Sequence, residues 1–303
     1  MKKLYYEDVH KTVFEAVVNI CTYDEKKKLY QVVMNQTAFF PEEGGQVADK
    51  GTLAFYEANQ NEPTLLPLLD AHIKENIIYH YVEKEIPAGT IVTGTVDWEQ
   101  RFDFMQQHSG EHIVSGLVNR YFGYDNVGFH LGLQEVTLDF NGTLTMEQLL
   151  EIEKKANQAV WKNLPIDISY PSSEELQTLE YRSKLDLTEN VRIVSVPGYD
   201  VCACCAPHVD TTGQIGIIKI TNVQSHRGGV RVNILCGNRA LEDYCIKQRN
   251  AASISAALSV KQNLISDGVD RLKEELMKQR ETINRLQADL LTTFANNLPA
   301  PSE

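Results

Sequence analysis

The sequence predicts an α+β protein in three parts: a small β-barrel over residues 1–95, an α/β domain over 96–237 and a long coiled-coil-like helix within 238–303. Short β-rich runs fill the first third, strand and helix patterns mix in the middle, and apolar residues follow a heptad spacing near the end. A chain of 303 residues is long enough for about two domains. Its 43% hydrophobic and 23% charged residues are ordinary for a folded chain.

The first part contains short runs rich in Val, Ile, Leu, Thr and Tyr, separated by turn-forming residues. They lie at 13–20, 30–34, 51–56, 65–71, 77–82 and 89–96. Strands of this length and spacing suggest a small barrel. Residues 37–51, TAFFPEEGGQVADKG, contain Gly44 and Gly45, which allow backbone conformations closed to other residues. The spacing alone favours a tight hairpin and a functional loop equally.

The middle part alternates helix and strand patterns. A helix is expected over 106–121 and ends at Gly123, which is a typical stop signal. Thr145 with Gln148 three residues later forms a capping-box pattern that begins a second helix. Strands are expected at 127–130, 135–140, 166–170, 191–196, 215–223 and 230–235, with a hairpin loop over 224–229.

The last part carries an apolar seam with alternating spacings of four and three. Seven of its eight positions are apolar: Ile265, Val269, Leu272, Leu276, Ile283, Leu286 and Leu290, with Gln279 as the exception. This spacing is typical of a coiled coil, so we expect a homodimer through this helix. The tail that follows resembles a linker, as in a chain cut before a further domain or in a natural short form.

Two pairs of metal-ligating side chains repeat the same offset. His108 and His112 stand four apart in a predicted helix, where both imidazoles share one face. Cys204 and His208 have the same spacing almost a hundred residues later. Three imidazoles and one thiolate favour zinc, so we predict one Zn²⁺ per chain. Whether three or four of them bind it, and whether Cys202 or Cys205 replaces Cys204, stays open.

The composition limits which kinds of binding partner and which cellular compartment are expected. Six cysteines, three of them crowded into 202–205, are a poor layout for disulfides and fit a reducing cytoplasm. The net charge of −12 argues against a generic nucleic-acid binder but permits local basic patches. No apolar run approaches the roughly 20 residues of a membrane span, and the first residues lack a signal peptide's apolar region. We expect neither a membrane nor a DNA partner.

In order along the chain, these motifs resemble those of the AlaX proteins, free-standing relatives of the editing domain of alanyl-tRNA synthetase. Residues 37–51 resemble the family's F-x-P-x-G-G-G-Q-x-x-D-x-G segment. The first metal motif is matched by VDWEQR and HSGEHIVSG within 96–116, and the following strand pair by VGFHLG and VTLDF. NLPID at 163–167, the second metal motif at 204–219 and the hairpin at 226–233 complete the succession. The long C-terminal helix implies the longer AlaX type, here without the terminal domain or truncated before it.

Two departures from the family pattern affect the site. Glu43 replaces one of the three glycines, which would weaken contact with tRNA phosphates. The usual C-G-G-T-H motif is Cys-Cys-Ala-Pro-His at 204–208, so the outer ligands remain while Pro207 stiffens the turn.

The resemblance implies an editing domain of the threonyl/alanyl-tRNA synthetase type. The implied reaction is zinc-dependent hydrolysis of mischarged tRNA(Ala), chiefly Ser-tRNA(Ala) and also Gly-tRNA(Ala). We expect His130 and Thr137 to contact the substrate, with Thr137 a partner for the serine hydroxyl. Glu111 is expected to turn away from the metal face and not to act as a base. The predicted tRNA contacts are Gly44, Gly45, Gln46, Arg101, Arg227 and Arg231.

Two other functions remain compatible with the sequence. One is a tRNA-binding or assembly module with a closed structural zinc, since four protein ligands usually mark a structural site. The other is an editing hydrolase for a different mischarged tRNA.

Overall fold

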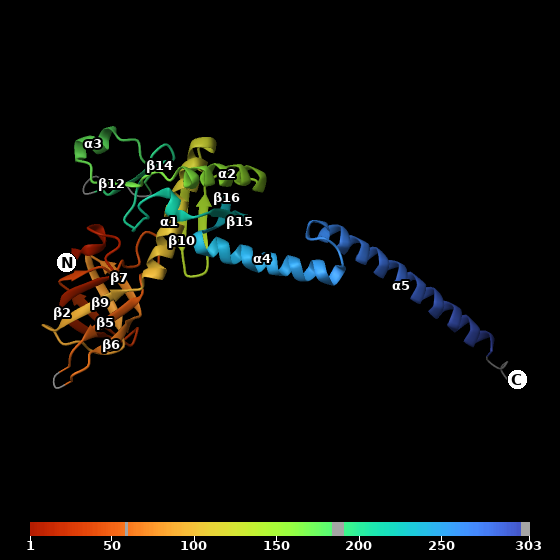
Figure 1. Cartoon of the computed structure of the whole chain (residues 1–303), viewed down its shortest axis with the longest axis horizontal. Helices are drawn as coiled ribbons and strands as arrows, with labels where there is room; N and C mark the ends of the chain where they lie inside the picture. Colours follow the sequence, from red (N-terminus) through yellow and green to blue (C-terminus); the bar gives the residue numbers. More distant parts are fainter. Residues whose placement is uncertain (58–59, 184–190, 298–303) are drawn as a thin grey trace. The chain divides into compact units, whose positions relative to one another are not determined.

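The computed structural model describes residues 1–57, 60–183 and 191–297 (Figure 1). The chain divides into two compact units, Met1–Leu241 and Glu242–Glu303. The first unit contains the predicted first and second parts, each with its own hydrophobic core. The boundary expected near residue 95 stays a prediction.

The N-terminal sheet is antiparallel and curled, with the strand order β6-β5-β9-β2-β3-β8-β7. Its strands are β2 (Val13–Asp24), β3 (Leu29–Met34), β5 (Gly51–Phe55), β6 (Thr64–Leu68), β7 (Asp70–Lys74), β8 (Ile77–Val82) and β9 (Ile91–Val96). The first half of β2 pairs with β9 and its second half with β3, with a bulge between Val18 and Ile20 that favours the curl. A short parallel pair, β1 (Lys2–Lys3) and β4 (Gln36–Thr37), lies beside it.

The predicted strand 65–71 is two strands, β6 and β7, and this corrects the expected barrel. These two strands form opposite edges of the sheet although only Leu69 separates them in sequence. The sheet must therefore curl until its edges meet at Leu69. Within the described residues β6 and β7 form no ladder with each other, so the sheet is a half-barrel and not a closed one.

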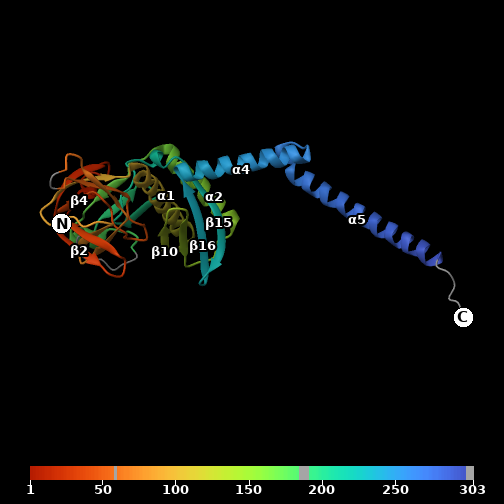
Figure 2. The same ribbon diagram turned by 90° about the horizontal axis from the view of Figure 1, so that it is seen from below.

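The middle part packs two helices on one face of a four-stranded antiparallel sheet, β10-β11-β16-β15 (Figure 2). The helices are α1 (Trp98–Phe122) and α2 (Met146–Lys162), and the strands are β10 (Asn126–Leu131), β11 (Val136–Phe140), β15 (Ile218–His226) and β16 (Gly229–Cys236). The predicted capping box of Thr145 and Gln148 is confirmed. The loop expected over 224–229 is a tighter turn, because the β15–β16 ladder continues to the pair of His226 and Gly229.

Helix α1 begins eight residues before the predicted start. Asp97 caps it by accepting a hydrogen bond from the backbone N–H of Gln100, and Gly123 ends it with a φ of 69°. The helix packs against the four-stranded sheet on one side and β14 on another, so residues 104–118 are all buried. A helix buried on all sides has no apolar stripe, which explains why periodicity located only part of it.

A second, smaller sheet has the order β12-β13-β14, with all pairs antiparallel. Its strands are β12 (Asp167–Ser169), β13 (Ile193–Val196) and β14 (Asp200–Ala203), and helix α3 (Ser173–Thr178) follows β12. The chain then passes through a short 3₁₀ turn at Thr212–Ile215 before β15. The predicted strands 166–170 and 191–196 are therefore present but shorter.

The C-terminal segment is helical, as predicted, but interrupted. Helix α4 (Gly237–Leu258) ends before a short 3₁₀ turn at Gln262–Leu264, and α5 (Ile265–Asn296) follows. From Leu272 to Leu290 the apolar residues of the predicted seam are more than 40% exposed. Among the described residues, no helix combines the length and the apolar character that crossing a membrane requires.

One buried histidine of the curled sheet makes its stability depend on pH. His80 is fully buried, its Nδ1–H donates to the carbonyl of Val32 at 3.0 Å, and its Nε2 accepts from the hydroxyl of Thr37 at 2.9 Å. The bond from Thr37 requires the neutral ring, because a protonated Nε2 has no lone pair to accept it. Burial lowers the pKa of His80 from 6.5 to about 4.

We predict that this histidine destabilises the protein in mild acid. Between pH 6.5 and 4 the unfolded chain binds a proton that the folded chain excludes, so stability falls by up to about 3 kcal/mol as the pH decreases. In His80→Gln this pH-dependent contribution should be absent. The free energy of unfolding in urea at both pH values, beside the exposed-site control His10→Gln, measures it. An equal loss in the wild type and His80→Gln would contradict the assignment.

Candidate metal centre

Helix α1 presents two of the predicted ligands on one face. His108 and His112 lie one turn apart and are 3% and 2% exposed, with their ring centroids 5.5 Å apart. The ring of Phe129 from β10 packs on His108 at a centroid distance of 4.7 Å. Both rings are therefore nearly buried.

The loop that follows strand β14 supplies the other two ligands. Cys204 Sγ lies 3.5 Å from His108 Nε2 and 3.3 Å from His208 Nε2. The guanidinium of Arg192 holds this loop by donating to the carbonyls of Cys204 and Ala206. One ligand atom from each of His108, His112, Cys204 and His208 lies within 4.8 Å of the other three. The four side chains that sequence spacing selected thus meet and could hold one metal ion.

Each histidine is oriented by a bond from its other ring nitrogen. Gln46 Oε1 lies 2.8 Å from Nδ1 of His108, Asp200 Oδ2 lies 2.9 Å from Nδ1 of His112, and Ser109 Oγ lies 3.0 Å from Nδ1 of His208. A carboxylate can only accept, so Nδ1 of His112 carries a proton and Nε2 faces the centre. This is the arrangement that metal-binding histidines require. Burial alone would lower the pKa of this ring, but Asp200 raises it well above 6.5, so a metal ion would have to displace a proton from Nε2.

The thiol of Cys204 is suited to bind as a thiolate. Burial by itself would raise its pKa, but the adjacent histidines, above all His108, outweigh that effect and hold the pKa well below the usual value. Burial lowers the pKa of His208 to about 3, so this ring is neutral. A thiolate and neutral imidazoles are the metal-binding forms of these side chains.

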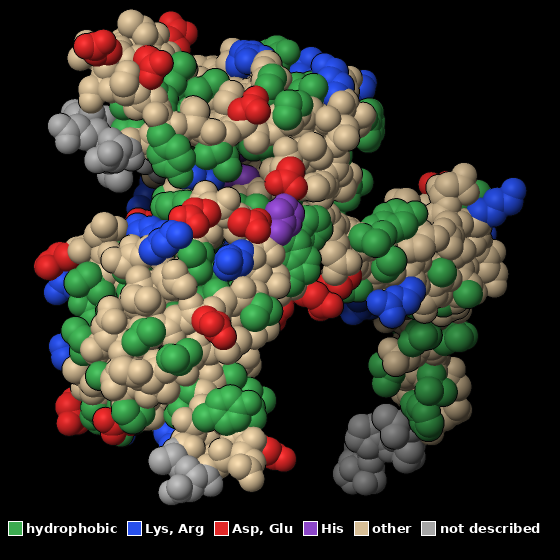
Figure 3. All heavy atoms as spheres, turned by 60° about the vertical axis from the view of Figure 1, so that its left-hand side comes forward, with side chains coloured by type: hydrophobic (Ala, Val, Ile, Leu, Met, Phe, Trp, Pro, Cys, Tyr) green, Lys and Arg blue, Asp and Glu red, His purple; other side chains and the backbone are tan. Residues whose placement is uncertain are grey.

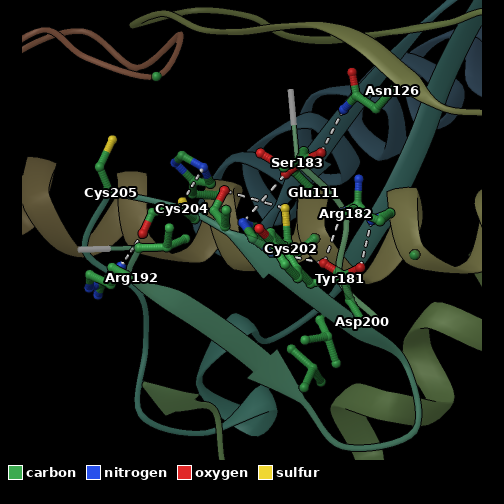
Figure 4. A pocket seen from close by; sticks show the side chains of 18 of the residues that line it. Glu111, Asn126, Tyr181, Arg182, Ser183, Arg192, Asp200, Cys202, Cys204 and Cys205 are labelled. Carbon is green, nitrogen blue, oxygen red and sulfur yellow. Dashed lines mark hydrogen bonds and ion pairs between the residues drawn. The ribbon is translucent and has the colours of Figure 1, made fainter. Parts of the chain in front are cut away.

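The structure distinguishes Cys204 from its neighbouring thiols. Asp200 and Cys202 alternate onto one face of β14 and Cys204 follows directly after the strand, whereas Cys205 lies apart from them, with Gly44 beside it (Figure 4). Cys202 approaches His112 and Asp200 but is outside the group of four, and burial raises its pKa to about 11. Cys204 is therefore the cysteine placed to complete the site.

A large cavity opens beside these ligands. It has a volume of about 1040 Å³, and its lining includes His108, His112 and Cys204, together with the side chains of Figure 4. Several aromatic residues also line it: Tyr6, Phe129, Tyr170, Tyr181 and Tyr199. A substrate could reach the metal-binding face of α1 through this cavity.

Glu111 lies in this cavity wall, and the expectation that it turns away from the site is wrong. One carboxylate oxygen accepts from Ser115 Oγ and Asn126 Nδ2, both at 2.6 Å, and the other lies 3.9 Å from His112 Nε2. Glu111 directly precedes His112, which suggested a different face of the helix. Its long side chain nevertheless folds back toward His112. No pattern in the sequence indicated that Asn126 would bond Glu111 or that Asp200 would bond His112.

Two predicted substrate contacts lie elsewhere. Phe129 faces His108, so His130 points to the opposite face of the sheet, as does its cross-strand partner Thr137. Neither is among the described residues that line the cavity. Strand alternation therefore places neither side chain in the cavity, including Thr137, the expected partner of a serine hydroxyl.

The predicted tRNA contacts have mixed outcomes. Arg101 is 1% exposed, its guanidinium pairs with Asp49 and donates to the carbonyls of Val9 and Ala38, and it has no surface for a phosphate. Gln46 is also buried and serves His108 instead. Arg231 binds Asp139 through two hydrogen bonds of 2.6 and 2.7 Å, which leaves Arg227 as the exposed arginine of this hairpin.

The two glycines have a structural reason to be present. Gly45 has a φ of 86°, and a Cβ there would lie 2.3 Å from the carbonyl oxygen of Phe129. Its own carbonyl accepts from the N–H of Leu131 at 2.7 Å, so the segment docks directly on β10. Gly44 lines the cavity, where it remains a candidate substrate contact.

Comparison of the sequence with known proteins relates this chain to one class of protein. Residues 191–232 match the family model of the threonyl and alanyl tRNA synthetase second additional domain. This stretch includes β13, β14 and the Cys204–His208 half of the site.

Individual relatives define the class further. The chain is 29% identical to alanyl-tRNA editing protein Aarsd1 of Danio rerio, over 88% of this chain and 62% of that protein. It is 28% identical to the putative alanyl-tRNA editing protein alaX of Saccharomyces cerevisiae, over 90% and 64% respectively. An alanine–tRNA ligase of Methanobrevibacter smithii is 28% identical, over 97% of this chain and 33% of the ligase. The chain is a homologue of the alanyl-tRNA editing proteins and of the editing region of alanyl-tRNA synthetase, and it spans about a third of such a ligase.

We predict that Asp200 controls the metal affinity through His112. Asp200→Asn removes the negative charge that holds the ring, and loss of such a partner typically weakens metal binding about 10- to 100-fold. Competition of the protein with a chromophoric chelator for Zn²⁺ measures the effect. Asp139→Asn is the matched control, because Asp139 also binds an arginine through two bonds but lies outside the site. Equal affinities in all three proteins would show that the contact is irrelevant to the metal.

Proposed function

We propose that the protein is a zinc-dependent hydrolase that removes the amino acid from mischarged tRNA(Ala), chiefly Ser-tRNA(Ala) and also Gly-tRNA(Ala). The observation that carries this proposal is a Cys–His₃ set that opens on a cavity of about 1040 Å³ in a homologue of alanyl-tRNA editing proteins. Nitrogen and sulfur donors in this combination fit zinc better than Mg²⁺ or Ca²⁺.

The residues of the site have different roles in the proposed ester hydrolysis. Zinc bound to the four side chains would polarise the ester carbonyl and lower the pKa of a bound water. The carboxylate of Glu111, held by Ser115 and Asn126, is placed to orient a water and accept its proton. The water oxygen bonds to the carbonyl carbon, the bond to the ribose oxygen breaks, and that oxygen takes a proton. The products are the free amino acid and tRNA.

A second function is favoured by one observation. All four ligand atoms converge, and a site closed by four protein ligands is usually structural. A tRNA-binding or assembly module with a structural zinc is therefore the alternative. His208 does not line the cavity, whereas the other three ligands do, so any exchange of a ligand for water would occur on the side of His108, His112 and Cys204.

We predict that the purified protein deacylates Ser-tRNA(Ala), and that the activity is lost in His108→Ala and after chelation. Glu111→Gln should lower kcat by about 10²- to 10⁴-fold, because proton transfer loses its acceptor. Release of radiolabelled serine from the tRNA measures the rates.

Three controls are needed to interpret the deacylation assay. Metal content must be equal in the wild type and Glu111→Gln, so that a slow variant is not simply an empty one. Folded, zinc-loaded wild type that hydrolyses no ester would favour the binding module. A panel of other mischarged tRNAs would reveal a hydrolase for a different amino acid or tRNA.

The second proposed partner is another copy of the same chain, bound through α5 as a parallel coiled coil. With Val269 and Leu276 as positions a, Glu275 is a position g and Arg280 the next position e. In a parallel pair, Glu275 of one helix faces Arg280 of the other. An antiparallel pair would lose this match.

We predict a dimer at tens of micromolar in sedimentation equilibrium. Glu275→Arg should weaken it because two arginines then face each other, and the double variant Glu275→Arg/Arg280→Glu should restore it. A wild-type monomer at this concentration would refute the pairing, and failure of the double variant to restore association would refute its parallel direction.

A further inference from the structure

A second, smaller hollow lies beside the metal-site cavity. It has a volume of about 370 Å³ and lies between the C-terminal halves of α1 and α2 and the turn before β14. Arg120, Gly198 and Tyr199 line both hollows, so the two form one continuous surface. Anything that enters the large cavity from this side crosses the small hollow.

The small hollow is basic although the protein is acidic. Arg120, Lys155 and Lys162 line it, and none of its described lining residues is acidic. None of these three forms an ion pair with a described carboxylate, in a chain of net charge −12. Lysine and arginine side chains gather along the upper edge of the molecule in Figure 3. The local charge is thus opposite to that of the whole molecule.

Aromatic rings hold the two lysines in place. Lys155 Nζ lies 5.0 Å from the ring centroid of Tyr121, and Lys162 Nζ lies 5.4 Å from that of Tyr199 and 3.1 Å from its hydroxyl. A cation over a ring keeps its charge and its donors. Both ammonium groups therefore remain able to bind an anion at the surface.

We propose that this hollow is the surface on which the acceptor arm of a tRNA lies, with its phosphates on Lys155, Lys162 and Arg120. Seven residues separate the two lysines, which is about 10 Å along a helix. Successive phosphates of one strand of an A-form RNA duplex lie only a few ångström apart along the axis, so the two lysines span several phosphates. The strand then continues past Tyr199 into the cavity with its 3′ end. This inference rests on the proposed function, which supplies the aminoacylated 3′ end.

The same side chains also have a structural role. Arg120 and Lys162 lie in the last turns of α1 and α2, where positive charge stabilises the helix, and Arg120 donates to the carbonyl of Gly198. A useful test must therefore separate binding from stability. Lys155 lies in neither last turn, and arginine substitutions keep the charge at both lysine positions.

Binding of uncharged tRNA(Ala) tests the proposal without any hydrolysis. Fluorescence anisotropy at several salt concentrations gives Kd for the full-length wild type, Lys155→Ala/Lys162→Ala and the control Lys26→Ala, an exposed lysine between β2 and β3. We expect the double variant to bind more weakly at low salt, with a log Kd–log salt slope lower by about 2. Lys26→Ala should match the wild type, and Lys155→Arg/Lys162→Arg should keep the slope.

The outcomes separate this inference from the proposed function. A slope and Kd unchanged in Lys155→Ala/Lys162→Ala, or wild type that does not bind tRNA, would overturn the interface. A protein that loses binding with these lysines but hydrolyses no ester would keep the interface and reject the hydrolase. If the alanine variant is unstable in urea, its glutamine counterpart Lys155→Gln/Lys162→Gln provides the same comparison.

Discussion

The bond between His112 and Asp200 joins helix α1 to strand β14, and the candidate metal centre depends on it. Burial alone would raise the pKa of Asp200, but the bonds from Arg182 and His112 hold it below its usual value, so the buried carboxylate stays charged. A buried charge is tolerated only when it is paired in this way. The charge holds a proton on Nδ1 of His112 and ties the helix to the strand that leads into Cys204.

Arg182 links this centre to the wall of the cavity. Its side chain binds both oxygens of Asp200 at 2.7 and 2.8 Å, while its backbone exchanges hydrogen bonds with Val201 and Ala203 at the edge of β14. Tyr181 and Arg182 themselves line the cavity. The residues that would meet a substrate are therefore connected to a metal ligand by two consecutive contacts.

The N-terminal part contributes to the same centre. Gln46 orients His108, and the close approach of Gly45 to Phe129 brings Gln46 within reach. Arg101 at the start of α1 binds Asp49 in the same segment, which further secures it to the helix. Residues 37–51 thus support the site and also form part of its cavity wall. Both roles follow from the docking of Gly45 on β10.

The sequence by itself selected the four candidate ligands, the end of α1 at Gly123, the capped start of α2 and most strands, because these depend on local spacing. A four-residue offset places two histidines on one helix face, and a capping box or a glycine at positive φ acts within one turn. The seam of α5 belongs to the same group, although its partner remains a prediction.

Only the tertiary structure decided which other side chains serve the site. Arg101 and Gln46 resembled surface contacts, but both are buried where residues 37–51 dock on α1. His130 and Thr137 face the wrong side of a sheet whose orientation depends on the helices packed against it. Glu111, Asp200 and the residues of the basic hollow lie in segments far apart in the chain. Local sequence patterns do not predict how such segments pack together.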